Sequence, residues 1–250
     1  MTHRFFAPGV DPAAPTTSRL PAEEAHHLLR VLRLSAGATV RVFDGRGREW
    51  LATVEEAGRS GVVVRIGTPV EPAPEPPVDV TLAVALQTGD RMDTVVREAT
   101  ALGVAAIVPL VTAHVAVPAR ARDSKAAIER WQRVAVASVK QCGRASVPTV
   151  HATATLASVL ADPVVTRSGA ARILMCVEPS RRGADTACGH GPRPASALAL
   201  VGPEGGWTDA EIAKAVAVGG TLVHLGPRTL RADLAPTVLL SALWSVWGWQ

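Results

Sequence analysis

The stretch Leu198-Ala-Leu-Val-Gly-Pro-Glu-Gly-Gly-Trp207 begins as an apolar strand and ends in a glycine-rich loop. A second stretch of similar design, Leu225-Gly-Pro-Arg-Thr-Leu-Arg-Ala-Asp233, follows it further along the chain. Each stretch leads from a strand through a loop toward a helix. In open α/β sheets, ligands bind at the carboxyl ends of neighbouring parallel strands. The two stretches therefore predict one pocket, lined by backbone, in an α/β domain.

The first loop, Gly202-Pro-Glu-Gly-Gly206, has the composition of a ligand-binding turn. Glycine permits positive φ and lets a ligand approach bare backbone. Thr208, with Glu211 three residues later, predicts a capping box that opens a helix. The loop has neither the Gly-Lys-Ser/Thr of a phosphate-binding loop nor a dinucleotide fingerprint. A tight strand-to-helix turn is the alternative, but Glu204 favours a loop that is anchored or that contacts a ligand.

The second loop places Arg231 just before a helix that we expect to begin at Asp233. Gly226 and Pro227 predict a fixed turn ahead of it. An arginine directed into a pocket can stabilise an anion that develops on a substrate. The alternative is a salt bridge from Arg231 to Asp233 or to Glu204.

A proline-rich segment, Thr68-Pro-Val-Glu-Pro-Ala-Pro-Glu-Pro-Pro77, divides the chain. Repeated proline removes backbone donors and favours extended structure, which is typical of a semi-rigid linker. A surface loop within one domain is the alternative. We predict a domain over residues 1–70, a linker over 71–78 and a second domain over 79–250, which a chain of 250 residues can accommodate.

The two predicted domains differ in their secondary-structure pattern. The first has a short helix over 21–32 and strands over 39–43, 48–54 and 61–66, with a hairpin signal at Asp44-Gly45. This pattern predicts a small β-barrel. The second alternates strands with helices, which predicts a mostly parallel sheet covered on both faces. Its expected strands are 78–86, 105–110, 173–177, 197–201 and 222–225, and its expected helices are 90–102, 123–141, one opening at Thr208, and 233–247.

Composition limits the function classes only in part. The formal charge is +4, and Lys125, Lys140 and Lys214 are the only lysines among 26 Lys and Arg residues. Arginine suits phosphate and base edges, but net charge alone is weak evidence for nucleic-acid binding. Basic residues beside Phe5 and Phe6 near the N-terminus are compatible with RNA contact. The alternative is a solvated face with both phenylalanines in the core.

The remaining signals concern metals and location. The three cysteines share no metal-ligand spacing, and we expect no metal site; Cys188-Gly-His190 is a weak candidate. An odd cysteine count without a secretion signal fits a reducing compartment. No apolar run approaches the ~20 residues that a membrane-spanning helix needs. We therefore expect a cytoplasmic protein that makes no membrane contact.

Further motifs occur in a fixed order around the two loops. They are His27-Leu-Leu-Arg-Val-Leu-Arg33, Phe43-Asp-Gly45, Gly89-Asp-Arg-Met-Asp93, Ala99-Thr-Ala-Leu-Gly-Val104, Arg130-Trp-Gln132 and Gln141-Cys-Gly-Arg144. With the two loops they resemble the RsmE family, the ribosomal RNA small subunit methyltransferase E group of the SPOUT superfamily. The resemblance covers nearly the whole chain, and the order and spacing of the motifs are more specific than any one of them.

The resemblance implies a PUA-like β-barrel that binds RNA and a SPOUT-type, mostly parallel sheet with a C-terminal trefoil knot. It implies a homodimer that uses S-adenosyl-L-methionine to methylate uridine N3 in 16S rRNA of the 30S subunit. Catalytic roles would fall to Arg231 and Glu204. Cofactor contacts would come from Leu200, Val201, Gly202, Pro203, Glu204, Gly205, Gly206, Leu225, Gly226, Leu230, Arg231 and Ala235. RNA contacts would come from Arg4, His27, Arg30, Arg33 and Arg144.

Several polar positions depart from the family pattern. These departures are Thr88, Ala101, Ala113, His114, Lys140, Asp233 and Leu234. They leave the identity of the catalytic base and the RNA specificity open. Alternative functions are a non-catalytic RNA-binding or ribosome-assembly protein of the same fold, a methyltransferase with another RNA target, and a nucleotide enzyme that uses the glycine-rich loops.

Overall fold

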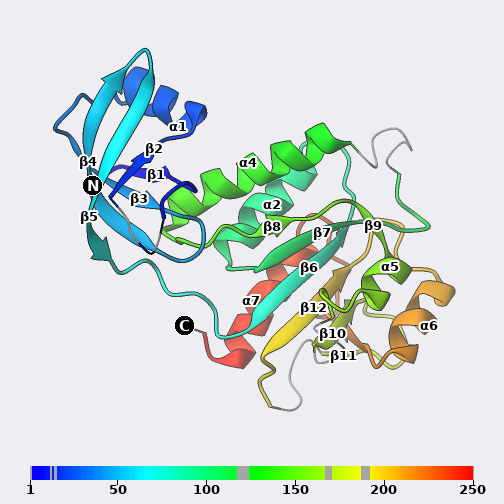
Figure 1. Ribbon diagram of the computed structural model, residues 1–250. Coiled ribbons are helices and arrows are strands. Elements are labelled where there is room, and N and C mark those ends of the chain that lie inside the picture. The colour runs from blue at the N-terminus through cyan, green and yellow to red at the C-terminus, as the bar shows by residue number, and fades with distance from the viewer. Residues whose placement is uncertain are drawn as a thin grey trace. The chain divides into compact units, whose positions relative to one another are not determined.

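The structure is a computed structural model that describes residues 2–11, 13, 16–116, 124–166, 171–186 and 192–249 (Figure 1). The chain forms two compact units: Met1–Glu75 with Val136–Val147, and Pro76–Ala135 with Pro148–Gln250. The boundary between Glu75 and Pro76 falls inside the segment for which we predicted a linker. Residues 136–147, which the sequence placed in the second domain, pack with the first unit.

The N-terminal unit contains a five-stranded sheet in the order β1-β3-β4-β5-β2. Its strands are β1 (Arg4–Phe6), β2 (Thr17–Arg19), β3 (Thr39–Phe43), β4 (Glu49–Gly58) and β5 (Gly61–Val70). β1 pairs parallel with β3, and all other pairs in this sheet are antiparallel. Two register shifts interrupt the β4–β5 pairing, and such bulges bend a sheet. Alternate residues of β3, β4 and β5 enter a core that also holds Phe5 and Leu28.

The hairpin predicted at Asp44-Gly45 is present between β3 and β4. The Asp44 carboxylate accepts the backbone N–H groups of Arg46 at 2.7 Å and Arg48 at 3.1 Å. Gly45 has a φ of +80°, a conformation that glycine adopts without strain. The helix predicted over 21–32 is divided into α1 (Ala22–His26) and a π-helical turn, η1 (His27–Val31). Arg33, with a φ of +54°, follows the end of this segment.

The C-terminal unit is built on a sheet of order β11-β13-β10-β12-β6-β7-β8, with β9 also paired to β7. All of its strand pairs are parallel. The strands are β6 (Asp79–Ala85), β7 (Ala106–Val111), β8 (Thr149–Val150), β9 (Ala154–Thr155), β10 (Arg172–Cys176), β11 (Asp185–Thr186), β12 (Ser196–Val201) and β13 (Thr221–His224). The helices are α2 (Arg91–Ala101), α4 (Lys125–Cys142), α5 (Leu156–Ala161), α6 (Asp209–Ala217) and α7 (Ala235–Trp247). The last residues of α4, from Val136, belong to the N-terminal unit.

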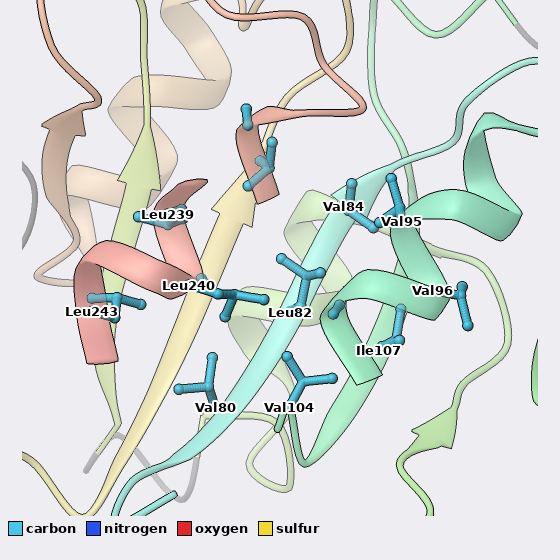
Figure 2. Close-up of a cluster of buried hydrophobic side chains, with 14 of the residues drawn as sticks. Val80, Leu82, Val84, Val95, Val96, Val104, Ile107, Leu239, Leu240 and Leu243 are labelled. Carbon is cyan, nitrogen blue, oxygen red and sulfur yellow. The ribbon is translucent and has the colours of Figure 1, made fainter. Parts of the chain in front are cut away.

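Helices cover both faces of this sheet, as predicted. On one face, Val80, Leu82 and Val84 of β6 pack with side chains of α2 and α7 (Figure 2). On the other face, Leu198 and Leu200 of β12 pack with α5 and α6. Every residue of β12 is buried, which explains why the central strands are continuous apolar runs.

The main strands and helices of the C-terminal unit confirm the predicted α/β class. The short elements β8, β9, β11 and α5 were not predicted from sequence, and α5 depends on a capping box between Thr155 and Ser158. The weak metal candidate Cys188-Gly-His190 lies outside the described residues. The trefoil knot stays a prediction.

Candidate functional site

A pocket opens at the carboxyl ends of β10, β12 and β13, the place predicted from the two glycine-containing loops. The three strands lie side by side, with β10 between β12 and β13. The pocket walls are mostly apolar side chains and loop backbone. The lining residues are Cys176, Val177, Glu178, Pro179, Val201, Gly202, Pro203, Glu204, Gly206, Trp207, Leu225, Arg228, Thr229, Leu230, Ala232 and Ala235.

The Gly202–Trp207 loop is held by its own tryptophan. The Trp207 indole N–H donates to the Cys176 carbonyl at the end of β10, at 2.9 Å. The indole lies against the bare Cα of Gly202, where a Cβ atom would come within 2.9 Å of the ring. Gly206 N–H donates to the Pro203 carbonyl at 2.9 Å and closes the turn. The loop is therefore tied to the neighbouring strand before any ligand binds.

The opposite side of this loop contacts the segment that follows β7. His114 Nδ1 lies 2.9 Å from the Gly205 carbonyl oxygen and 3.1 Å from that of Gly206. Both are acceptors, so this ring nitrogen carries the proton. Next to it, the Glu211 carboxylate accepts the Ala113 N–H at 3.0 Å and closes the capping box with Thr208. Burial raises the pKa of Glu211, but the hydrogen bonds from Thr208 and Ala113 outweigh it and hold this pKa below its ordinary value.

Two ion pairs lie beside the pocket. Arg91, at the start of α2, pairs with Glu204, and Arg231 pairs with Asp233 at 2.8 Å. The hydrogen bond and charge of Arg231 lower the pKa of Asp233, and Arg91 contributes in the same direction. The sequence analysis gave a salt bridge from Arg231 to Asp233 as the alternative to an arginine directed into the pocket, and this salt bridge is present. Glu204, in turn, is bound by Arg91, a residue of the Gly89–Asp93 motif to which the sequence assigned no role.

Most predicted cofactor residues line the pocket, but four do not. Those that line it are Val201, Gly202, Pro203, Glu204, Gly206, Leu225, Leu230 and Ala235. The side chain of Leu200 is fully buried in the core on the far face of the sheet, because alternate residues of a strand point to opposite faces. Gly205 and Gly226 belong to the loops without contributing to the lining. The guanidinium of Arg231 is largely exposed and paired with Asp233, between lining residues Leu230 and Ala232.

The loop after β10 was missed as part of the site. Cys176, Val177, Glu178 and Pro179 all line the pocket. Burial, and then the nearby Glu178 carboxylate, raise the pKa of the Cys176 thiol to about 12, so the thiol is protonated and unreactive at neutral pH. The parallel pairing of β10 with both β12 and β13 would have identified this loop, but strand order cannot be read from one sequence.

Arg4, predicted to bind RNA, makes its contacts inside the N-terminal unit. Its guanidinium forms two hydrogen bonds with the buried carboxylate of Glu49, at 2.8 and 3.0 Å. It also donates to the carbonyl oxygens of Val139, Lys140, Gly143 and Arg144 at the end of α4. A guanidinium has five N–H donors, so none is left for an RNA phosphate. The structure makes Arg4 a structural residue that caps the end of this helix.

Arg144 and His27 were also expected to contact RNA as cations, but their surroundings do not favour this role. Arg144 is buried and donates to both carboxylate oxygens of Glu75, at 2.7–3.2 Å. Burial, with the nearby Lys140 ammonium, lowers the pKa of His27 below its ordinary value of 6.5. The ring therefore carries less positive charge at pH 7 than an ordinary histidine. Phe5 is fully buried, in agreement with the core alternative.

Arg30 and Arg33 fit the RNA prediction better. Both side chains are exposed, and the intervening Val31 is 61% exposed. Within the part of the chain that the structure describes, no group of three metal-ligand side chains is close enough to hold an ion. In the same part, no helix is both long and apolar enough to cross a membrane.

The fold and the pocket together define an RNA methyltransferase with a PUA domain. Residues 74–244 match the RNA methyltransferase domain family, and residues 20–67 match the RNA methyltransferase PUA domain family. The chain is 34% identical over 227 residues to the ribosomal RNA small subunit methyltransferase E of a Synechocystis species, covering 91% of this chain and 72% of that protein. The chain belongs to the ribosomal RNA small subunit methyltransferase E family, RsmE.

Other relatives and solved structures agree with this assignment. The Bacillus subtilis family member is 29% identical over 92% of this chain and 90% of its own length. A structure of the Neisseria gonorrhoeae family member bound to S-adenosyl methionine is 28% identical, with a TM-score of 0.85 over 99% of this chain and 98% of that one. A Legionella pneumophila methyltransferase with bound S-adenosylmethionine is also 28% identical, with a TM-score of 0.86 over 98% of each chain.

Proposed function

We propose that this protein transfers the methyl group of S-adenosylmethionine to N3 of a uridine in 16S rRNA. The observation that carries the proposal is the loop-lined pocket at the ends of β10, β12 and β13, in a chain that belongs to the RsmE family. Such a substrate would place the protein in the cytoplasm. The finer choice of uridine N3 comes from the family resemblance.

The residues of the pocket suit an adenosine-containing cofactor. Val177, Val201, Leu225 and Leu230 provide apolar walls for a flat base, and the loop residues Gly202 and Gly206 add lining without bulky side chains. Glu178, Arg228 and Thr229 supply polar groups for the rest of such a molecule. When bound, S-adenosylmethionine supplies a methyl group that is already activated for transfer.

The protein must then orient the uridine, accept its N3 proton and stabilise the anion left on O2 or O4. We propose Arg231 for the last task, because it is exposed at the edge of the pocket. Its pair with Asp233 would give way when the uridine anion competes for the guanidinium. Glu204, bound to Arg91, would hold the loop; its role as proton acceptor requires release from this pair.

We further propose that the protein is a homodimer. The side chains of Leu234 and Val246, at the two ends of α7, are 45% and 48% exposed. A second copy could cover this part of the surface. Sedimentation equilibrium at micromolar concentration tests this proposal, and a mass equal to one chain would contradict it.

The decisive experiment is methyl transfer from labelled S-adenosylmethionine to 30S subunits that lack the uridine N3 mark. Mass spectrometry of the digested rRNA should identify 3-methyluridine. Transfer that yields another methylated nucleotide would indicate a different RNA target. Cofactor binding without transfer would favour a non-catalytic RNA-binding protein, an alternative suggested by Arg231 being paired with Asp233 and by the departures at Ala113, His114 and Lys140.

A further inference from the structure

Glu178 is an acidic residue in the pocket whose specific ligand group has not yet been assigned. It follows the end of β10 by two residues, and its side chain lines the pocket. One carboxylate oxygen lies against the bare Cα of Gly206, where a Cβ atom would come within 2.3 Å of it. Among the residues that the structure describes, its carboxylate has no hydrogen-bond or ion-pair partner. The other lining carboxylate, that of Glu204, is already bound to Arg91.

The position of Glu178 in the sheet indicates which part of a ligand it meets. β10 and β12 are neighbouring parallel strands, with Cys176 opposite Val201. The glycine-rich loop follows β12, and Glu178 follows the adjacent β10. In dinucleotide-binding folds, an acidic residue beside a glycine-rich loop hydrogen-bonds the ribose hydroxyl. Here the same pair of features occurs at the ends of two adjacent strands.

The chemistry of a carboxylate fits a vicinal diol. Its two oxygens accept hydrogen bonds and cannot donate them when ionised, and a ribose presents two adjacent hydroxyl donors. Hydrogen bonds to an ionised group are stronger than those between neutral groups. The neighbouring side chains Val177 and Trp207 are apolar. A bound ligand that gave the Glu178 carboxylate no hydrogen-bond donor would therefore partly desolvate it, at a cost in binding free energy.

We propose that the Glu178 carboxylate accepts hydrogen bonds from the 2′- and 3′-hydroxyls of the cofactor ribose. This inference rests on the proposed function, because it assigns a residue to the cofactor pocket. Glu178 would make the site selective for ribonucleoside ligands over their deoxy analogues. It would do so independently of the methionine part of the cofactor.

The test compares two neutral ligands that lack the methionine charges, 5′-methylthioadenosine and its 2′-deoxy analogue, by calorimetric titration. The wild type should bind the ribonucleoside about tenfold more tightly than the deoxy analogue, the difference expected for one hydrogen bond to a charged acceptor. In Glu178→Ala, this preference should fall to within about twofold. The matched control is Glu129→Ala, which removes an exposed carboxylate whose pair with Lys125 is at 3.7 Å; it should keep the wild-type preference.

Two outcomes would overturn the inference alone. In one, Glu178→Ala weakens both nucleosides equally, which would indicate a packing role. In the other, it weakens S-adenosylmethionine while leaving the preference between the nucleosides unchanged, which would place the carboxylate at the charged methionine part. Failure of the wild type to bind S-adenosylmethionine or either nucleoside would instead overturn the proposed function, and the inference with it.

Discussion

At the scale of single residues, the edge of the pocket carries alternating charges. Arg91 binds Glu204, and Arg231 binds Asp233. The hydrogen bond between Arg231 and Asp233 is the main cause of the raised pKa of Arg231 and the lowered pKa of Asp233; Glu204 and Arg91, respectively, add to these shifts in the same directions. All four are on loops or at helix starts around the pocket. The side chains of Arg91, Glu204 and Arg231 are solvent-exposed, and such pairs contribute little to stability; we expect their arrangement to serve the function of the site.

Replacing Arg231 should therefore affect chemistry more than folding. In Arg231→Ala, we expect methyl transfer to fall by about 100-fold, the loss typical of removing one group that stabilises a developing anion. The affinity for S-adenosylmethionine should stay within about twofold, because the Arg231 side chain does not line the pocket. Single-turnover transfer at saturating cofactor, together with calorimetry, measures both quantities. Lys214→Ala, an exposed change on α6, is the control, and full activity of Arg231→Ala would remove Arg231 from the mechanism.

Gly206 provides a second test at this scale. Its φ is +69°, and a Cβ atom there would displace the Glu178 carboxylate. Gly206→Ala should lower the free energy of unfolding by about 1 kcal/mol through backbone strain and should also weaken binding of 5′-methylthioadenosine. Gly219→Ala is the matched control, since Gly219 has a φ of +84° with no atom within 4 Å of the added Cβ. It should lose similar stability in urea unfolding with unchanged ligand affinity; equal affinity losses in both variants would contradict the assignment.

At the scale of elements, Glu211 joins the start of α6 to the segment after β7. Its carboxylate accepts hydrogen bonds from Thr208 and from the Ala113 N–H. Because these bonds hold the pKa of Glu211 below its ordinary value of 4.5, the ionised carboxylate stabilises the folded state. This stabilisation is complete above pH 4.5 and is lost as the pH falls through the lowered pKa of the folded protein.

Glu211→Gln should lower the free energy of unfolding by about 1 kcal/mol at pH 7, as expected for a damaged helix cap. The difference from the wild type should shrink as the pH falls below 4.5. Urea unfolding at pH 7 and at several acidic pH values tests this expectation. Glu129→Gln should show no such trend. If the difference in free energy of unfolding between the wild type and Glu211→Gln stays constant with pH, the charge of the carboxylate is not the source of the stabilisation.

Arg4 organises the end of another element, α4. Arg4→Ala would remove the donor that the last carbonyls of the helix share with the buried Glu49 carboxylate, which would keep its longer ion pair with Arg41 at 3.7 Å. Removing one partner of a buried pair typically costs about 3–5 kcal/mol, so this variant should unfold at much lower urea concentration. Arg30→Ala, an exposed change in the same unit, should stay within about 0.5 kcal/mol of the wild type. Unchanged stability of Arg4→Ala, with weaker RNA binding, would instead restore the RNA role predicted from sequence.

The elements that could be predicted from sequence are those whose local signals agree with their environment. Continuous apolar runs identified β6, β10 and β12, and the Thr208–Glu211 capping box identified the start of α6. Short strands such as β1 and β8 carry too few residues for a period to be visible, and their pairing depends on distant parts of the chain. Glu178 was missed for the same reason, because its place in the pocket follows from the order of the strands.

At the scale of the whole chain, basic residues could not be sorted by sequence alone. The sequence does not distinguish Arg4 and Arg144 from Arg33. In the structure, Arg4 and Arg144 stabilise the N-terminal unit through ion pairs with Glu49 and Glu75. Burial and an acidic partner decide between a structural arginine and a solvent-facing one, and both depend on the fold. The inclusion of residues 136–147 in the N-terminal unit could not be predicted from sequence for the same reason.

The distinction between structural and solvent-facing arginines leads to a prediction for RNA binding by the intact protein. Arg30 and Arg33 are exposed around Val31, so each can neutralise one RNA phosphate. Arg30→Ala and Arg33→Ala should each weaken binding of a 16S rRNA fragment several-fold and reduce the slope of log K against log salt by about one. Arg59→Ala, an exposed change in the turn between β4 and β5, serves as the control with an unchanged slope. Filter binding across a salt series measures these slopes.

If both variants keep the wild-type affinity and slope, RNA binds to another surface of the protein. The groove lined by His3, Arg41 and Lys140 in the same unit is then the next surface to mutate.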